Sequence, residues 1–426
     1  MIRILYVLRI LLKRSPYEWW VLIKKTFYGW WVLLALFLTY AASNGIGLYA
    51  FGVLRKMQSA DLGIDPARNG VLPGILFLTV AVMSMFVGWM LDRYSPRLIL
   101  AVGSIGVVAT VFGQMLVSSY EILMVYYVIF GLVMSLAGII SCMFLVNRWF
   151  HRYKGMAAGI LVVGSSVGGI VFPTLAAKAG DWHTASLWLG GMALIFVIPS
   201  LFIVKDSPEE LNLFPDGSET APNSANTEGS IVGVTLAEAL KTSSFYLVLV
   251  VTGSLWFCIN GYLQHNAFFC KDLGMDEKAA AGIIGLASML AILGKLSFGY
   301  LSDRIDKKMI MALSLGIMAI SLLILKGTIA NPSLLKIFAS VFGLGFGGAF
   351  AIIQIWVADI YAGKSFGAIL GVVTMVDTLV GMTGITSLGF MRKASGSYES
   401  SINLMIGLCG VALVCTFLVK KPEKSV

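Results

Sequence analysis

Twelve apolar segments, each long enough to cross a lipid bilayer, occupy most of the 426 residues of this chain. A membrane-spanning helix needs about 20 mostly apolar residues. Charged residues make up 12% of the chain, too few to cover a water-facing surface, so we predict an all-α integral membrane protein. The segments fall near residues 30–54, 69–91, 97–117, 121–146, 155–177, 184–204, 245–270, 279–302, 309–328, 333–357, 365–388 and 400–419.

A polar segment separates the first six apolar segments from the last six. It contains the run GSETAPNSANTEGS, which is too polar to enter a bilayer. We therefore expect two six-helix bundles joined by a linker. The expected divisions are an N-terminal bundle over 26–205, the linker over 206–243, a C-terminal bundle over 244–420 and a tail over 421–426.

The first 25 residues differ from the rest of the chain. The run MIRILYVLRILLKRS mixes Leu and Ile with four basic residues, so it is too charged to span a membrane. It also lacks the small-residue cleavage site of a signal peptide. Residues 1–25 are predicted to form a cytoplasmic amphipathic helix on the membrane surface, as an anchor or alternatively as a lipid sensor.

Lysine and arginine are distributed unevenly between the two sides of the membrane. With both termini on one side, that side receives 20 of them and the other side 10, while Lys295 stays inside a segment. Because cytoplasmic loops carry the basic excess, we expect a multi-pass protein of the cytoplasmic (inner) membrane with both termini and the linker in the cytoplasm. The same bias accounts for the net charge of +9 without a nucleic-acid partner.

Short motifs recur in the two halves at a nearly constant offset. Gly88, Asp92 and Arg93 in GWMLDR match Gly299, Asp303 and Arg304 in GYLSDR, 211 residues later. Other matches, at offsets of 211, 212 and 216, pair Asp61 with Asp272, Gly155 and Gly159 with Gly367 and Gly371, and Asn44 with Asn260. The series predicts two bundles related by a parallel repeat, a design that places a substrate site at the midplane between them.

The repeated Gly-x-x-x-Asp-Arg motif suggests a mechanical role. Its glycines, Gly88 and Gly299, allow two helices to approach closely. Its aspartates, Asp92 and Asp303, lie at helix ends, where each can pair with the adjacent arginine or accept from a neighbouring helix N-terminus. We expect both copies to act as conformational clamps; ordinary solvated loop charges are the alternative.

The twelve segments, the central linker and the twin Gly-x-x-x-Asp-Arg loops resemble the major facilitator superfamily over residues 28–420. The first loop departs from the fuller family motif, because Ser95-Pro96-Arg97 stands where Gly-Arg-Arg is usual. The resemblance implies the major facilitator fold, in which a single chain holds the whole site and moves substrate by alternating access. We therefore expect the chain to function as a monomer and to need no cofactor.

A narrower resemblance is to bacterial members of the monocarboxylate and oxalate/formate transporter group. It rests on an ordered set of short strings and bears on family more than on substrate. The strings are Phe27-Tyr28-Gly29-Trp30, the stretch from Asn147-Arg148-Trp149-Phe150 to Gly155, DSPEELNLFPDG from Asp206 to Gly217, and Gly396-Ser397-Tyr398.

Two ionisable residues lie deep in predicted spans. Lys295 precedes Asp303 by eight residues, about 12 Å of helix rise, and Asp377 lies ten residues past Gly367. An ionisable side chain at such depth costs about 2.5–3.5 kcal/mol on insertion scales, so it usually has a use. A pair is expected: either a permanent ion pair that locks two spans, or a Lys295 that meets an anionic substrate while Asp377 balances it or carries a proton.

The monocarboxylate resemblance implies a substrate role for Lys295, which matches a cationic position on the eighth span. The family's animal members also place an aspartate one turn earlier, where this chain has Ala291, and a lysine in the first span, near Tyr49. Because that relay is incomplete, Asp377 or Asp272 is expected to substitute. A lysine also lacks the bidentate fork with which arginine binds a carboxylate.

Several polar side chains in the spans are softer candidates. His265 could carry a proton, with a packing role as the alternative. The others could hydrogen-bond a substrate, although contacts between helices are the simpler role. These candidate substrate-binding residues are Asn44, Tyr49, Tyr126, Tyr127, Asn260, Gln264 and Gln354.

The leading functional hypothesis is a secondary transporter of a small organic anion, such as a monocarboxylate, coupled to protons; anion exchange without protons stays open as another mode of the same transporter. The alternative is an exporter of a larger metabolite, siderophore or drug. An enzyme is not expected, because no Ser-His-Asp set, HExxH motif or carboxylate dyad is visible. Direct ATP drive is not expected either, because no nucleotide-binding loop is visible. The five cysteines have no metal-ligand spacing, so no metal is expected.

Overall fold

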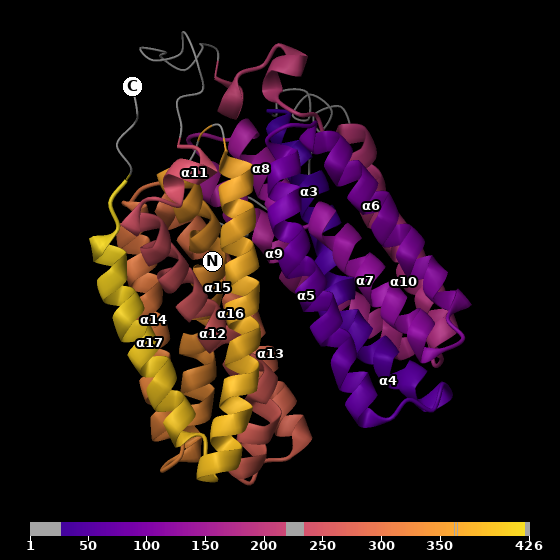
Figure 1. Cartoon of the computed structure of the whole chain (residues 1–426), viewed down its shortest axis with the longest axis vertical. Helices are drawn as coiled ribbons and strands as arrows, with labels where there is room; N and C mark the ends of the chain where they lie inside the picture. Colours follow the sequence, from indigo (N-terminus) through magenta and orange to yellow (C-terminus); the bar gives the residue numbers. More distant parts are fainter. Residues whose placement is uncertain (1–26, 219–233, 362, 364, 422–426) are drawn as a thin grey trace, which may run out of the picture.

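The computed structural model describes residues 27–218, 234–361, 363 and 365–421. Twelve helices in this part of the chain are long and apolar enough to cross a membrane, which confirms the all-α membrane fold. The amphipathic segment predicted for residues 1–25 lies outside the described residues. Figure 1 shows the helices in two groups, one before and one after the linker, standing side by side.

The first six spans are built from α3 to α10. The first span joins α3 and α4 through a π-helical turn, and the fourth joins α7 and α8 across Ala137-Gly138. The bounds are α3 Gly29–Asn44, the π-helix Gly45–Ala50, α4 Phe51–Asp61, α5 Pro66–Leu91, α6 Pro96–Gly113, the 3₁₀ turn Gln114–Leu116, α7 Tyr120–Leu136, α8 Ile139–Trp149, α9 Lys154–Lys178 and α10 Trp182–Ile203.

The last six spans are built from α12 to α17, and the described residues of the linker before them form three short helical turns. The spans are α12 Ser243–Asp272, α13 Glu277–Ser302, α14 Lys307–Gly327, the 3₁₀ turn Pro332–Leu334 with α15 Leu335–Tyr361, α16 Phe366–Ser395 and α17 Glu399–Leu418. The linker turns are Pro208–Leu211, Pro215–Gly217 and α11 Leu236–Ala239.

Several helices run past the apolar segments that predicted them. The first span reaches Asp61 instead of residue 54, and the eleventh reaches Ser395 instead of residue 388. Backbone hydrogen bonds continue the helix after the apolar run has ended, and polar side chains on those turns face water or their neighbours. Apolar length therefore underestimates helix length at these ends.

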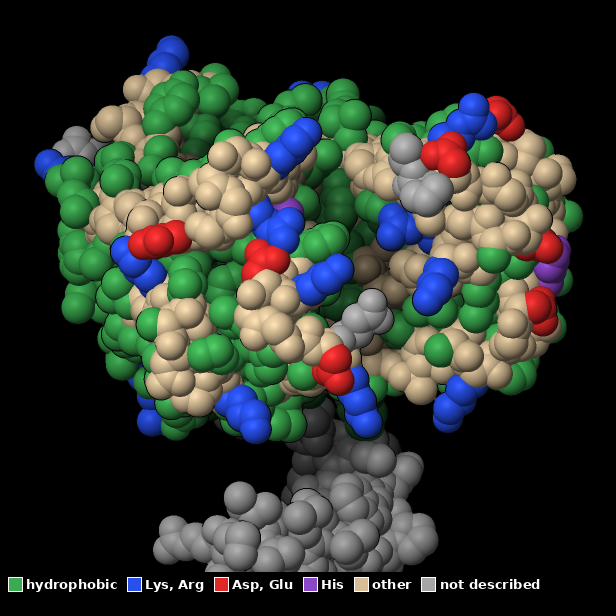
Figure 2. Space-filling view, turned by 90° about the horizontal axis from the view of Figure 1, so that it is seen from below, with side chains coloured by type: hydrophobic (Ala, Val, Ile, Leu, Met, Phe, Trp, Pro, Cys, Tyr) green, Lys and Arg blue, Asp and Glu red, His purple; other side chains and the backbone are tan. Residues whose placement is uncertain are grey.

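The two halves meet mainly through two pairs of helices. α5 packs against α16, and α9 packs against α13. We call the end of the molecule that carries residues 206–218 and α11 the linker face; it is uppermost in Figure 1, and the halves diverge from it toward the other end. Seen from that other end, Figure 2 shows a furrow between the two lobes, walled largely by hydrophobic side chains.

Candidate functional site

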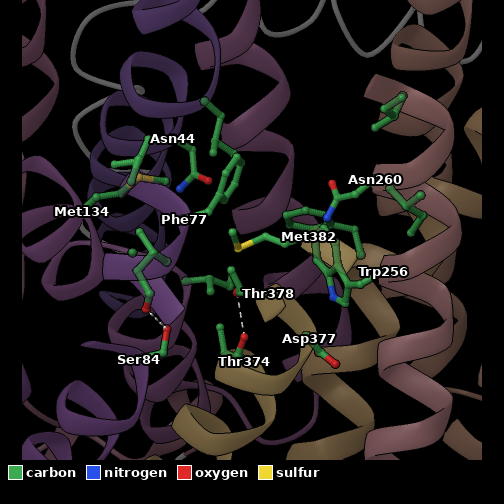
Figure 3. Close-up of a pocket in the computed structure, with 18 of the residues that line it drawn as sticks. Asn44, Phe77, Ser84, Met134, Trp256, Asn260, Thr374, Asp377, Thr378 and Met382 are labelled. Carbon is green, nitrogen blue, oxygen red and sulfur yellow. Dashed lines mark hydrogen bonds between the residues drawn. The ribbon is translucent and has the colours of Figure 1, made fainter. Parts of the chain in front are cut away.

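A cavity of about 410 Å³ lies between the halves and is lined by residues of both. Figure 3 shows Asn44, Phe77 and Met134 on the wall formed by the first half, opposite Trp256, Asn260 and Met382 on the second. Asn44 ends α3 where the π-helical turn begins. The wider turn that follows carries Leu48 and Tyr49, and both line the cavity. Such turns are frequent at functional sites.

The described cavity wall is aromatic and amide-rich, with one charged side chain, Asp377. No lysine, arginine or histidine is among these lining residues. Gln354 Oε1 and Thr374 Oγ1 are buried without a hydrogen-bond partner among the described residues, so both can accept from a ligand. The aromatic lining residues are Tyr40, Tyr49, Phe77, Trp256, Phe346 and Phe350.

The cavity brings together many of the polar residues singled out from the sequence. Those that line it are Asn44, Tyr49, Asn260, Gln264, Gln354 and Asp377. Tyr126 and Tyr127, expected there as well, lie elsewhere. The Tyr127 ring packs on Phe51, with centroids 5.2 Å apart, and Tyr126 covers Gly113. Both tyrosines serve packing within the first half, because α7 turns that face toward α4 and α6.

Lys295 lies behind the cavity wall instead of lining it. Its Nζ donates to Ser165 Oγ and to Ser166 Oγ, each at 2.8 Å, across the α9–α13 contact. The same Nζ lies 4.8 Å from the ring centroid of Phe350 and 5.9 Å from that of Phe346, and both rings line the cavity. The side chain is 2% exposed. In this conformer Lys295 therefore bridges the two halves, screened from the cavity by aromatic rings.

The expected pairing of Lys295 with Asp377 is wrong for this conformer, since no ion pair joins them among the described residues. The two helices turn these side chains in different directions. Lys295 faces α9, whereas Asp377 is directed toward α12 (Figure 3). Asp377 Oδ1 is buried without a hydrogen-bond partner in the described chain. Similar depth in the membrane thus did not bring the charges together.

The internal repeat relates Lys295 and its two serine partners to a second set of polar residues that includes Asp377. At an offset of 211, Lys295 corresponds to Ser84; at 212, Ser165 and Ser166 correspond to Asp377 and Thr378. Lys295 and the two serines meet at the α9–α13 contact. Ser84 belongs to α5, and Asp377 and Thr378 belong to α16, the two helices that form the matching contact. Ser84 and Thr378 line the cavity but were not singled out from the sequence. The repeat offset, applied to every polar residue in the spans, would have found them.

His265 and Asp272 lie outside the cavity, toward the end of α12 away from the linker face. His265 Nε2 lies 2.8 Å from the carbonyl oxygen of Ile385 and therefore donates to it, while Nδ1 lies 2.8 Å from the hydroxyl of Tyr398. Asp272 accepts two hydrogen bonds from Arg392, one of them at 2.8 Å from Nε. Both predicted proton carriers are thus engaged in contacts within the second half.

The two repeated aspartates each accept from a helix N-terminus in the opposite half. Asp303 accepts from Gly155 N at 2.6 Å and Met156 N at 2.8 Å. Asp92 accepts from Gly367 N and Ala368 N, both at 2.8 Å. The sequence allowed two partners for each aspartate, the adjacent arginine or a neighbouring helix N-terminus. In the structure both carboxylates accept from a helix N-terminus.

The neighbouring arginines stack on aromatic rings. Arg93 lies 4.3 Å from the ring centroid of Trp89, and Arg304 lies 4.2 Å from that of Tyr300.

Burial raises the pKa of the Asp92 and Asp303 carboxyls above the ordinary value, while their backbone hydrogen bonds act in the opposite direction.

Glycines bring the helices of each clamp into backbone contact. A Cβ on Gly299 would lie 2.6 Å from Gly155 O and 2.8 Å from Gly159 Cα. In the other contact, a Cβ on Gly88 would overlap Gly367 O. The glycines matched by the repeat, Gly155 and Gly367, therefore meet the glycines of the Gly-x-x-x-Asp motif across the interface.

Replacing Asp303 by asparagine should loosen the linker face. Asparagine keeps one acceptor in place of two and loses the charge, and hydrogen bonds to charged groups contribute about 1.5–3 kcal/mol each. We expect amide hydrogen exchange at Gly155 and Met156 to become at least about tenfold faster. Asp181→Asn, at an exposed N-cap of α10, provides the control. Unchanged protection at Gly155 and Met156 would contradict the clamp.

Comparisons with known proteins identify the family. The model of the Major Facilitator Superfamily matches residues 26–305 and 267–426. The chain is 25% identical to "MFS-type transporter 1" of an Ophiocordyceps species, over 86% of this chain and 78% of the relative. It is 22% identical to the fujikurins efflux protein of Gibberella fujikuroi, over 80% of this chain and 72% of that relative. It is also 22% identical to YcxA of Bacillus subtilis, an uncharacterized MFS-type transporter, over 85% of this chain and 88% of that relative.

Solved structures show the same fold. The proton:xylose symporter XylE superposes with a TM-score of 0.76 at 13% identity, covering 93% of this chain and 97% of that chain. FucP, solved in the outward conformation, superposes with a TM-score of 0.70 at 14% identity, covering 92% and 98%. The superfamily is one of transporters, not of enzymes. With its twelve spans and its family match, this chain is a multi-pass membrane transporter that belongs to the Major Facilitator Superfamily.

Proposed function

We propose that this transporter exports an organic metabolite of low polarity by alternating access. The observation that carries the proposal is the cavity: it is shared by the two halves, it is rich in aromatic and amide side chains, and its described wall has no cationic residue. A volume of about 410 Å³ falls within the roughly 300–1,000 Å³ of pockets that hold drug-sized ligands. Among the relatives, two are named as efflux proteins, for agnestins and for fujikurins.

The two clamps indicate which state of the proposed transport cycle the structure represents. Asp92 and Asp303 hold the halves together at the linker face, while the furrow of Figure 2 lies at the other end. With the linker face in the cytoplasm, as the basic loops favour, this conformer is closed to the cytoplasm and open outward. The two bundles, 26–205 and 244–420, then rock about the cavity as units within one monomer of the inner membrane.

Proton coupling is proposed to depend on Asp377. It is 3% exposed, lines the cavity and has one carboxylate oxygen without a hydrogen-bond partner in the described structure. A carboxylate in this setting is best stabilised by a proton or by a cationic group of the substrate. Asp272 is already paired with Arg392, so it is the weaker candidate.

A small organic anion remains the second candidate, because of Lys295. Its ammonium group is buried against two hydroxyls and two rings, with no carboxylate within 4 Å among the described residues. The strings that resemble the monocarboxylate and oxalate/formate group also favour this substrate class. An anion would reach Lys295 after Phe346 and Phe350 move, in another conformer of the cycle.

Transport by proteoliposomes separates the two candidates. The labelled probes are neutral aromatic compounds (umbelliferone and naringenin) and small acids (lactate, pyruvate, formate and oxalate), each with and without a proton gradient. We expect transport of a neutral aromatic probe, lowered at least about tenfold by Trp256→Ala because a buried aromatic contact is worth about 2 kcal/mol or more. Lys295→Gln should leave that probe's binding unchanged. Trp188→Ala, on the outer surface of α10, is the control.

The opposite outcome would favour the second candidate. Uptake of a small acid that the gradient accelerates and Lys295→Gln abolishes would assign the substrate to the anion class. It would also show that the described cavity opens toward Lys295 during transport.

A further inference from the structure

The end of α10 and the residues that lead into the linker are fastened to the rest of the first half at several points. Tyr28 Oη donates to Ile203 O at 2.8 Å, and Trp149 Nε1 donates to Lys205 O at 3.1 Å. Asp206 accepts from Ser95 Oγ at 2.6 Å and from Arg97 N at 2.7 Å, at the start of α6. We call residues 204–218 the linker strap. Its sequence was singled out above as a family string, and the proposed transport cycle gives it no part.

Asp216 is the contact point between the linker strap and the loop before α9. Its Oδ2 accepts from His151 N at 3.0 Å and from Arg152 N at 2.7 Å, and its Oδ1 lies 3.4 Å from Tyr153 N. The residue has φ 61°, in the left-handed region that costs a non-glycine residue free energy. Asparagine and aspartate tolerate this region best, and the three backbone donors favour the carboxylate.

The first turn of α9, which follows this loop directly, supplies the N–H groups of the inter-half clamp. Asp303 accepts from Gly155 and Met156, two to three residues after the last N–H that faces Asp216. Residues 151–156 therefore lie between two carboxylates, one from the linker strap and one from the second half. Burial is the main cause that raises the pKa of Asp303, and the nearby charge of Asp216 adds to it.

We propose that Asp216 is a positioning residue for the Asp303 clamp: by fixing residues 151–153 it aims the N–H groups of Gly155 and Met156 at Asp303. The linker strap thereby takes part in closing the linker face, instead of serving as a passive connection. This inference rests on the proposed alternating access for its functional meaning. Its structural content, the coupling of two carboxylates through one loop, is tested without any substrate.

Two substitutions remove the carboxylate and keep the backbone. Asp216→Asn retains the side-chain shape and suits φ 61°, while Asp216→Gly removes the side chain and accepts the same φ at no steric cost. Asp206→Asn is the matched control, because Asp206 fastens the linker strap to the start of α6 and contacts no residue of the Asp303 clamp. The protein is the full chain, in nanodiscs.

The experiment is residue-resolved amide hydrogen exchange. We expect both Asp216 variants to exchange at least about tenfold faster at Gly155 and Met156, as well as at residues 151–153, while amides of α14 stay unchanged. Asp206→Asn should leave Gly155 and Met156 protected. If the Asp216 variants lose protection at residues 151–153 alone, or if Asp206→Asn accelerates Gly155 and Met156 equally, the proposal is overturned.

A double variant adds a second readout. If Asp216 acts through Asp303, adding Asp216→Asn to Asp303→Asn should accelerate exchange at Gly155 and Met156 no further, because the two changes remove one coupled contact. Additive effects of the two substitutions would show that Asp216 stabilises the loop independently and would contradict the proposal.

Discussion

Leucine in place of Gly299 is expected to exclude the described conformer almost completely. Even a Cβ at this position would lie 2.6 Å from Gly155 O and 2.8 Å from Gly159 Cα, which are backbone atoms that no side-chain rotation can remove. Overpacking a tight contact costs about 3 kcal/mol or more in such a case, over a hundredfold in population. The halves should therefore stay apart at the linker face, and transport should stop because the cycle cannot pass through this state.

The measurement is hydrogen exchange at Gly155 and Met156 together with proteoliposome transport. Both amides should lose protection, and Gly88→Leu should have the same effect on Gly367 and Ala368 at the other clamp. Gly282→Leu is the matched control: it lies on the same helix, α13, and a Cβ there meets nothing within 4 Å. Retained protection and transport in Gly299→Leu would refute the view that the glycines permit closure.

Asparagine in place of Asp377 is expected to stabilise the protein while removing its response to a proton gradient. The carboxylate is 3% exposed, and Oδ1 has no hydrogen-bond partner among the described residues. An ionised aspartate at such depth costs about 2.5–3.5 kcal/mol on insertion scales, and asparagine cannot ionise. We expect the free energy of unfolding in detergent to rise by about 2 kcal/mol, read as a higher thermal midpoint.

Transport by the same variant tests the coupling. Exchange of labelled for unlabelled probe should persist in Asp377→Asn, while accumulation driven by a proton gradient should be lost. Asp272→Asn is the control, because that carboxylate is paired with Arg392 at the end of α12; it should lower stability slightly and keep the gradient response. Gradient-driven accumulation in Asp377→Asn would place the proton carrier elsewhere.

The sequence predicted the features that depend on hydrophobicity and repetition. Twelve spans follow from apolar length, and the repeat that links Gly88 with Gly299 and Gly155 with Gly367 indicated two matching halves. That α5 pairs with α16 and α9 with α13 was found only in the structure. Which partner each aspartate takes could not be read from the motif. That choice depends on how closely two helices from opposite halves approach.

Side-chain direction was the main source of error. Depth along a span placed Lys295 and Asp377 at one level, but the face that each helix presents is set by its packing, and the two charges point to different neighbours. The same limit explains Tyr126 and Tyr127, which are polar enough for a cavity and yet fill space within the first half. The sequence also could not show that the described cavity wall has no cationic side chain, since Lys295 lies behind it.

The positions of Lys295 and Asp377 have an electrical consequence. Both belong to the second half, so they move together when that half tilts in the membrane field. While both are ionised their charges sum to zero, and the membrane potential does little net work on the tilting protein. A proton on Asp377 leaves the charge of Lys295 unbalanced, and moving one elementary charge across 100 mV is worth about 2.3 kcal/mol. The voltage dependence of the reorientation step therefore reports whether Asp377 is protonated.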